Sequence, residues 1–285
     1  MANKRFPKLS IAIPASIIAD IPHLREKTLR IGLIGRASAI FRVNNIIIYS
    51  DLSSCNQYRD SKLIFSILSY METPQYLRKH LFSLRPSLRY VGILPPLRTL
   101  HHPTANLVKD LRIGELREGV ILESNSKRSL VDVGVERLAN LQELKLPIGK
   151  RVTVKLVSFH RGIPFASLAE QEDIDVYWGY RVSVSKLTIG QILNNGVYKL
   201  KIATSKYGQP INELLEIGAF WKKSRRTIIA FGSPHKGLKE ILQNENIDIS
   251  EAVDLVVNTI PLQGTKTVRT EEAIWASLSV FNIMS

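Results

Sequence analysis

The segment at residues 257–281, VNTIPLQGTKTVRTEEAIWASLSVF, places a Pro/Gly turn directly before a helix start signal and an apolar helix. The polar and glycine positions of the turn are Asn258, Thr259, Gln263, Gly264 and Thr265. A glycine lets a ligand approach the backbone closely. Thr270, followed by Glu271 and Glu272, predicts the first turn of an amphipathic helix. This order predicts a loop that holds a small ligand.

The residues before this segment alternate between strand and helix patterns. Strand patterns at residues 9–14 and 46–49 flank a helical pattern at residues 23–41. A strand, a helix and a strand in this order predict a parallel pair joined by a right-handed crossover. The alternation returns after residue 177, with strand patterns at residues 180–185, 198–203, 227–231 and 255–257. The sequence therefore predicts an α/β fold.

The residues between the two α/β parts follow a different pattern. Residues 99–175 contain short alternating segments, which turn residues such as Asn125, Gly134 and Gly149 separate. About five antiparallel strands over this length fit a small all-β barrel of the OB type, a common platform for single-stranded nucleic acid, with a plain β-meander as the alternative. We therefore expect residues 1–98 and 176–285 to form one α/β domain that the barrel at residues 99–175 interrupts.

Three segments of the second α/β part follow predicted strand ends. They are residues 203–208, 231–237 and 258–265, and each contains glycine and polar side chains. Ligands of open α/β sheets bind beyond the carboxyl ends of the strands, so we expect the three loops to border one crevice. An ordinary strand-to-helix turn is the alternative for each loop. The chain has no GxGxxG motif and no P-loop ending, which disfavours a dinucleotide-binding domain or an NTPase.

The charge of the chain favours a polyanionic partner. The 285 residues include 39 Lys/Arg and 25 Asp/Glu, which gives a formal net charge of +14. Such a surplus is typical of nucleic-acid-binding proteins. Residues 74–109 contain no Asp or Glu, and a second basic cluster occupies residues 222–226. The cations predicted to contact RNA phosphates are Arg78, Lys79, Arg85, Arg89 and Arg98. A solvated basic surface is the alternative.

Several other classes of protein and site are disfavoured. No apolar run approaches the roughly 18 residues that a membrane helix needs, and the first residues resemble no signal peptide, so we expect a cytoplasmic protein with no membrane partner. Cys55 is the only cysteine, which excludes an intrachain disulfide and a cysteine-based zinc cluster. His101 and His102 are adjacent and have no cysteine or carboxylate nearby in the sequence, so we expect no metal site.

Parts of nearly the whole chain resemble the SPOUT class of RNA methyltransferases, and more narrowly its subfamily assigned to uridine-N3 methylation, which has an OB-like insert. The resemblance is clearest at residues 257–281, at IGRASAIFRV (residues 34–43) and at YVGILPPL (residues 90–97). It implies a trefoil knot in the C-terminal part, a homodimer, S-adenosyl-L-methionine as cofactor, and structured RNA, such as ribosomal RNA, as substrate.

The resemblance also implies roles for individual residues. Arg36 is the implied catalytic residue, because its guanidinium would stabilise negative charge on a uracil, whereas Arg42 lies at the helix end and is less suited. No general base follows from the resemblance: the position of Glu271 and Glu272 at the start of the last helix favours a role in complementing the helix N-terminus over a role as general base. The implied cofactor-binding residues are Thr204, Ser205, Tyr207, Gly232, Asn258, Thr259, Ile260, Gln263, Gly264 and Thr265, with an apolar contact from Leu262.

Two other functions remain open from the sequence. One is a noncatalytic RNA-binding or ribosome-assembly factor that keeps the fold. The other is a protein methyltransferase, which the basic surplus disfavours unless the target lies on the ribosome. Cofactor binding combined with methyl labelling of RNA separates the first function from both alternatives.

Overall fold

The chain folds into two compact units in this computed structural model, which describes residues 6–51, 57–170, 172–214 and 217–284. The first, called the α/β unit, contains the described residues from 6 to 71, Pro86–Leu97 and the described residues from Gly179 onward. The second, called the barrel unit, contains Glu72–Arg85 and Arg98–Trp178. Cys55 lies outside the described residues.

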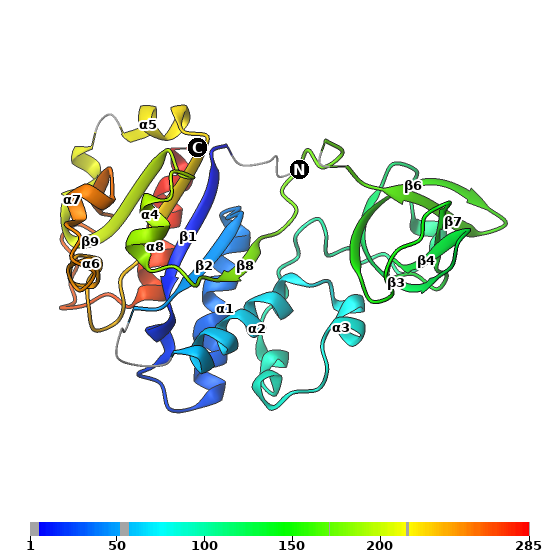
Figure 1. Ribbon diagram of the computed structural model, residues 1–285, viewed down its shortest axis with the longest axis horizontal. Coiled ribbons are helices and arrows are strands. Elements are labelled where there is room, and N and C mark those ends of the chain that lie inside the picture. Colours follow the sequence, from blue (N-terminus) through cyan, green and yellow to red (C-terminus); the bar gives the residue numbers. More distant parts are fainter. Residues whose placement is uncertain (1–5, 52–56, 171, 215–216, 285) are drawn as a thin grey trace. The chain divides into compact units, whose positions relative to one another are not determined.

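A six-stranded parallel sheet forms the centre of the α/β unit (Figure 1). The strand order is β11-β9-β10-β1-β2-β8. The strands are β1 (Lys8–Pro14), β2 (Asn45–Tyr49), β8 (Arg181–Val184), β9 (Leu200–Pro210), β10 (Arg226–Ala230) and β11 (Leu255–Asn258). The predicted α/β fold, built from two parts of the chain, is confirmed.

Helices cover both faces of this sheet. Ile11 and Ile13 of β1 pack in a core cluster with apolar residues of α1, α2 and α8, whereas Ala12 packs in a second cluster with residues of α4, α6 and α7. This follows from strand geometry, because successive side chains point to opposite faces. The helices are α1 (Leu24–Ile40), α2 (Tyr58–Glu72), α4 (Ile189–Asn194), α5 (Ile217–Lys223), α6 (Leu238–Gln243), α7 (Ile249–Ala252) and α8 (Thr270–Ile283). Both faces are therefore filled, and the strand ends are the places where this unit can hold a ligand.

The barrel unit contains a closed five-stranded barrel in the order β3-β4-β5-β7-β6 (Figure 1). Its strands are β3 (Leu116–Ser124), β4 (Arg128–Asp132), β5 (Ala139–Gln142), β6 (Arg151–His160) and β7 (Ile163–Leu168). Neighbouring strands are antiparallel, except that β5 and β7 are parallel. Alternate residues such as Val131, Leu141 and Val154 fill its interior. The predicted small all-β barrel is confirmed, and the plain meander is excluded.

A short helix, α3 (Gln75–Leu81), belongs to the barrel unit although it precedes residue 99. The Tyr76 hydroxyl donates a hydrogen bond to the Glu118 carbonyl at 2.7 Å. The Tyr76 ring also packs over Gly134, where an added Cβ would lie 2.6 Å from the ring and where φ is +83°. Gly134 is therefore needed both for the turn and for the close approach of α3.

Short 3-10 helices complete the described structure. They are Ala15–Ile18, Pro86–Leu88, Val91–Ile93, Val108–Asp110 and Ile211–Glu213. Among the described residues, no helix combines the length and the apolar character that crossing a bilayer requires.

Candidate functional site

The carboxyl ends of β10, β9 and β11 lie at one edge of the sheet. The three strands are neighbours and run parallel, so their ends must meet there. Two of the three segments predicted to border a cofactor follow the ends of β10 and β11, and the third, residues 203–208, begins where Ala203 pairs with Ala230 at the end of β10. The structure thus brings the predicted residues of the three segments to one edge of the α/β unit, while their role toward a cofactor stays a prediction.

The first of these segments is a bulge and not a free loop. The strand predicted at residues 198–203 extends to Pro210, so the prediction of its end was wrong. Ala203 pairs with Val256, but the next pair along β11 joins Val257 to Gln209. Thr204, Ser205 and Tyr207 therefore lie on a bulge between two paired stretches of β9. Bulges frequently accompany functional sites, because they redirect side chains out of the ladder.

Contacts within this bulge fix its backbone and leave Tyr207 exposed. The Thr204 hydroxyl donates to the Ala230 carbonyl of β10 at 3.3 Å, and the Ser205 hydroxyl accepts from the Tyr207 N–H at 3.2 Å. The Tyr207 side chain is 87% exposed, with the Lys206 Nζ 4.9 Å from its ring centroid. An added Cβ at Gly208 would lie 2.7 Å from the Val256 carbonyl oxygen. Gly208 is therefore required where the bulge returns to β11.

The side chain of Asn258 joins the bulge to the last loop. Its Nδ2 donates to the Lys206 carbonyl at 3.0 Å, and its Oδ1 accepts from the Ile260 N–H at 3.0 Å. One amide therefore fixes two of the three predicted segments relative to each other. A residue with only a donor or only an acceptor could not make both contacts.

The loop after β10 is fixed from both sides of the sheet edge. The Tyr49 hydroxyl, at the end of β2, donates to the Phe231 carbonyl at 2.6 Å, and burial raises the pKa of Tyr49 well above its usual value. The Thr270 hydroxyl, at the start of α8, donates to the Gly232 carbonyl at 3.2 Å. An added Cβ at Gly232 would lie 2.9 Å from the Leu238 nitrogen. The sequence analysis missed Tyr49 as a positioning residue, although a tyrosine at a strand end was a visible signal.

The last loop, residues 259–265, presents open backbone and an exposed apolar side chain. The Thr259 hydroxyl lies 2.8 Å from the Ser277 hydroxyl of α8, and Gln263 Nε2 donates to the Thr265 carbonyl at 2.8 Å. Leu262 has φ +57° and is completely exposed. An added Cβ at Gly264 would meet nothing within 4 Å. This loop therefore has both room and apolar surface for a ligand.

Arg36 lies in α1 and contacts a connecting segment of the same unit. Its Nη1 donates to the Pro96 carbonyl at 3.0 Å and to the Leu97 carbonyl at 2.7 Å. A guanidinium has further donors on Nε and Nη2, so these contacts orient the group without using all of it. The neighbouring Gly32 has the Leu94 side chain where its Cβ would lie, at 2.4 Å. Arg36 is therefore held in place by the motif at residues 90–97.

The two acidic residues at the start of α8 have different environments. The Glu272 carboxylate accepts from the Arg269 N–H at 2.9 Å, which caps the helix. Glu271 is buried, and its Oε1 lies 3.1 Å from Arg30 Nε in α1. Its Oε2 is buried and makes no hydrogen bond among the described residues. Burial raises the pKa of Glu271, although the neighbouring Arg30 acts in the opposite direction.

The five predicted RNA-binding cations divide between the two units. Arg89 lies in the α/β unit, and the other four lie in the barrel unit. Arg78 Nε donates to the Thr73 carbonyl at 2.9 Å, whereas the Lys79 side chain is 70% exposed and 4.0 Å from Asp132. Arg85 and Arg98 are exposed. Arg78 thus contributes to the structure, and the exposed cations are better placed to contact phosphates.

One of the paired histidines, His101, belongs to a charged cluster that the sequence analysis missed. This cluster, Glu72, His101, Glu118 and Arg151, lies within the barrel unit. Glu72 accepts from Arg151 Nη1 at 2.7 Å and Nη2 at 3.0 Å, and Arg151 Nε donates to Glu118 at 2.7 Å. His101 Nε2 lies 2.9 Å from the Glu72 carbonyl oxygen. The described residues include no group of three His, Cys, Asp or Glu that could hold a metal ion.

The pKa values of Glu72, a member of the cluster, and of His102, which is next to it, are both lowered. Burial raises the pKa of Glu72, but the hydrogen bonds from His101 and Arg151 outweigh burial and lower this pKa to about 2. His102 Nε2 lies 2.7 Å from the Glu72 carbonyl oxygen. Burial, followed by the proximity of His101, lowers the pKa of His102 to about 4. Glu72 is therefore ionised and His102 neutral at neutral pH.

Comparison with known proteins supports one family. A family model described as "Putative RNA methyltransferase" matches residues 8–281. An uncharacterized protein of Halobacterium salinarum is 32% identical, covering 94% of this chain and 96% of that protein. The 28S rRNA (uridine-N(3))-methyltransferases of Drosophila melanogaster and Homo sapiens are 31% and 30% identical over 95% of this chain, which corresponds to 61% and 77% of their lengths.

A solved structure also aligns with the chain. It is that of a "putative methyltransferase" from Legionella pneumophila with bound SAM, and it has a TM-score of 0.41 and 10% identity, covering 99% of this chain and 68% of that chain. The family match spans both units, from β1 to the buried Phe281 of α8. The chain therefore belongs to this RNA methyltransferase family.

Proposed function

We propose that the protein transfers a methyl group from S-adenosyl-L-methionine to RNA, with N3 of a uridine in ribosomal RNA as the acceptor. The observation that supports this most is the meeting of three polar, glycine-containing segments at one sheet edge in a member of an RNA methyltransferase family. Relatives named as 28S rRNA uridine-N3 methyltransferases support the acceptor atom.

The residues of the sheet edge fit this cofactor. Tyr207 and Leu262 are large exposed side chains on the first and last segments, and an adenosine would cover such apolar surface. The open space at Gly264 allows close approach to the backbone. When bound, the cofactor supplies an electrophilic methyl group. The residues that would hold it are Thr204, Ser205, Tyr207, Gly232, Asn258, Thr259, Ile260, Gln263, Gly264 and Thr265.

The remaining chemistry belongs to two side chains. Attack by uracil N3 requires loss of the N3 proton, and negative charge then develops on the carbonyl oxygens. Arg36 would stabilise that charge, and the Pro96 and Leu97 carbonyls keep its guanidinium oriented. Glu271 would accept the proton, because burial raises its pKa and one of its oxygens has no partner among the described residues.

We include a homodimer in the proposal. Leu29, Leu33 and Ile40 are exposed on α1, and their spacing of four and seven residues places them with Arg36 on one helix face. Exposed apolar faces of this kind are typical of interfaces. The apolar residues Ile274, Leu278 and Phe281 of α8 pack inside their own subunit, so α8 offers mainly Ile283 to such an interface. Size measurement in solution tests the dimer.

The trefoil knot is also part of the proposal. After β10, the chain passes to β11 on the far side of β9, and α8 then packs against α1. This order brings the last segment back across the sheet, as a threaded C-terminal part requires. An experimental structure in which the segment after β11 passes outside all preceding loops would contradict the knot.

The experiment that tests the function combines binding with transfer. Purified protein is mixed with methyl-labelled S-adenosyl-L-methionine and ribosomal RNA from cells that lack it, with RNA from cells that contain it as the control. We expect label in the first RNA alone, and nucleoside mass spectrometry should identify 3-methyluridine. Cofactor binding without transfer would favour a noncatalytic RNA-binding factor, and label in polypeptide alone would favour a protein methyltransferase. Absence of cofactor binding by calorimetry would exclude the methyltransferase.

A further inference from the structure

The barrel has a groove of about 310 Å³ on its outer surface, where β5 meets β7. Ala139 and Leu141 of β5 point into the barrel core, so Asn140 and Gln142, which alternate with them, point outward. The groove residues used below are Asn140, Gln142, Glu143, Val157, Ser158 and Phe165. The groove lies within one unit, and the core residues Leu141 and Ala166 contribute to its lining.

The strand pairing explains why a groove forms at this position. β5 and β7 share the single pair Asn140–Phe165, whereas every other pair of neighbouring strands in the barrel is longer. The register of β6 also shifts between Leu156 and Ser158, which places Val157 in a bulge at the groove. A short seam beside a bulge leaves space that side chains do not fill.

Asn140 lines this groove and carries an unsatisfied hydrogen-bond acceptor. The residue is 8% exposed, and its buried Oδ1 has no hydrogen-bond partner among the described residues. A buried polar atom without a partner destabilises the folded protein, so such atoms are few in native structures and a bound ligand can satisfy them. The amide provides both an acceptor and a donor. It therefore matches a ligand edge with neighbouring donor and acceptor groups.

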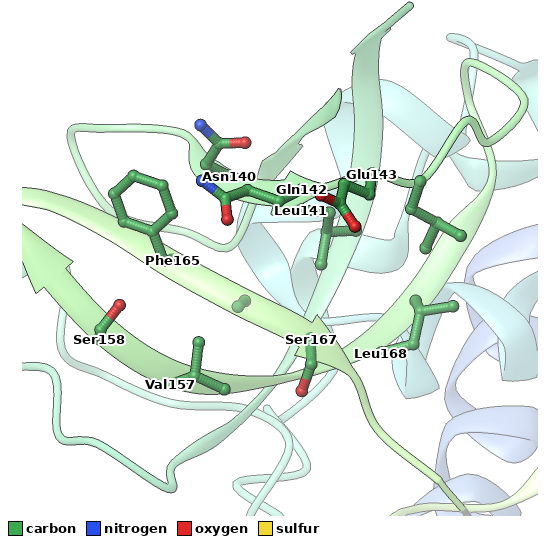
Figure 2. Close-up of a pocket in the computed structure, with 11 residues that line it drawn as sticks. Asn140, Leu141, Gln142, Glu143, Val157, Ser158, Phe165, Ser167 and Leu168 are labelled. Atoms are coloured by element: carbon green, nitrogen blue, oxygen red, sulfur yellow. The ribbon is translucent and has the colours of Figure 1, made fainter. Parts of the chain in front are cut away.

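An aromatic ring lies beside this amide. Phe165 is paired directly with Asn140, and Figure 2 shows its ring next to the amides of Asn140 and Gln142, with Val157 and Ser158 along the other side of the groove. Phe165 is half-buried and Val157 is 46% exposed. A ring for stacking, an amide for edge contacts and a hydroxyl together match a nucleobase.

The charged residues around the groove indicate where the base and the phosphate of a nucleotide would lie. The Glu143 carboxylate lines the groove and would repel a phosphate inside it. Arg128 is exposed and is paired across the ladder with Gln142, so its side chain is on the outer face beside the groove. A nucleotide would therefore place its uncharged base in the groove and its phosphate toward Arg128.

We propose that this groove binds one unpaired nucleobase of an RNA, stacked on Phe165 and hydrogen-bonded by Asn140. The groove belongs to the barrel unit and the sheet edge that would hold the cofactor belongs to the α/β unit, so the role assigned to the groove is recognition of RNA. The identity of the ligand as substrate RNA rests on the proposed function, whereas the base-binding geometry does not.

Binding of fluorescent single-stranded RNA to the full chain tests this proposal. The probes are 12-nucleotide oligouridylate and oligoadenylate, with an RNA duplex of the same length for comparison. Phe165→Ala and Asn140→Ala should each weaken single-strand binding about tenfold, because stacking and edge contacts are lost, and should change duplex binding little. Phe165→Trp should retain binding. The matched controls are Ile148→Ala and Asn106→Ala, which alter exposed residues of the barrel unit outside the groove.

The outcomes separate this site from the proposed enzyme. Unfolding midpoints and S-adenosyl-L-methionine binding of each variant show whether the fold is intact. Folded variants that bind both single strands as tightly as the unmodified protein would overturn the base site, even if RNA methylation is observed. Selective loss in both variants would support the base site, even if the protein labels no RNA. Loss of duplex and single-strand binding to the same extent would indicate general phosphate contact and would also overturn the proposal.

Discussion

The sheet edge of the α/β unit and the charged cluster of the barrel unit use polar groups in opposite ways. At the sheet edge, neutral groups such as the Tyr49 hydroxyl and the Asn258 amide hydrogen-bond to backbone carbonyls. In the charged cluster, the carboxyl groups of Glu72 and Glu118 each form an ion pair with Arg151, and the three side chains are at most 28% exposed. Neutral hydrogen bonds of this kind hold the loops in place and add no charged group that would repel a ligand. These partly buried ion pairs instead make the barrel unit sensitive to the loss of either partner.

The largest expected effect follows from removing one ion of the charged cluster. Glu72→Ala leaves Arg151 partly buried with one acidic partner, so we expect the barrel unit to lose about 3–5 kcal/mol of stability. Hydrogen exchange measures this for each unit, and β3–β7 should lose protection while the parallel sheet keeps it. Glu123→Ala, at an exposed site on β3, is the matched control. Equal loss of protection in both units would contradict the contrast between them.

We expect acid to destabilise the barrel unit at a higher pH than it destabilises the parallel sheet. The pKa of His102 falls from 6.5 to about 4 in the folded protein, so folded protein binds fewer protons than unfolded protein between these values. The pKa of Glu72 falls from 4.5 to about 2, with the same sign at lower pH. The stability that these two groups contribute is therefore complete above about pH 6.5. It falls as pH falls, by about 3 kcal/mol for His102 between pH 6.5 and 4 and by about the same amount for Glu72 between pH 4.5 and 2.

The acid effect is measured by urea unfolding at several pH values. His102→Gln should flatten the dependence between pH 6.5 and 4, and Glu72→Gln should flatten it below 4.5. His23→Gln, which alters an exposed histidine outside the barrel unit, is the control. A barrel unit whose stability rises on acidification would show that the direction of both shifts is wrong.

Arg36→Ala tests whether the α/β unit places a charged group at the reaction. We expect methyl transfer to RNA to fall about 100-fold, since a donor to developing negative charge is lost. The Kd for S-adenosyl-L-methionine should stay unchanged. Arg25→Ala, at an exposed position of the same helix, is the control. If the variant retains methyl transfer, Arg36 has no catalytic role, and its hydrogen bonds to the Pro96 and Leu97 carbonyls make it a structural residue.

A smaller effect, on cofactor affinity, is expected from a substitution at Gly264 in the last loop, where no other atom lies close to the backbone. Gly264→Ala meets no atom within 4 Å, so the unfolding midpoint of the free protein should not change. If the cofactor approaches this backbone, the added methyl group should weaken its binding about tenfold. Gly92→Ala, also in open space, is the control. Unchanged affinity measured by calorimetry in both variants would remove Gly264 from the cofactor site.

The sequence predicted features that depend on local patterns and missed those that depend on distant partners. The strands, the helix at α8 and the three segments follow from apolar spacing and turn residues within a few positions of each other. The bulge of β9 depends on the register that β11 imposes about fifty residues later. The sequence gives no sign that Glu72, the last residue of α2, forms an ion pair, because its partner Arg151 is distant in sequence. The open acceptor of Asn140 likewise exists only where β5 and β7 meet.

The smallest expected effect decides which unit provides contacts to RNA phosphates. Arg85 is an exposed cation of the barrel unit, and Arg225 is an exposed cation before β10 in the α/β unit. If the barrel unit holds the RNA backbone, Arg85→Ala should weaken RNA binding about two- to threefold and reduce the slope of log affinity against log salt by about 1, whereas Arg225→Ala should leave the slope unchanged. Salt titrations of both variants with ribosomal RNA measure this. The reverse result would assign phosphate contact to the α/β unit and leave the barrel unit with base recognition alone.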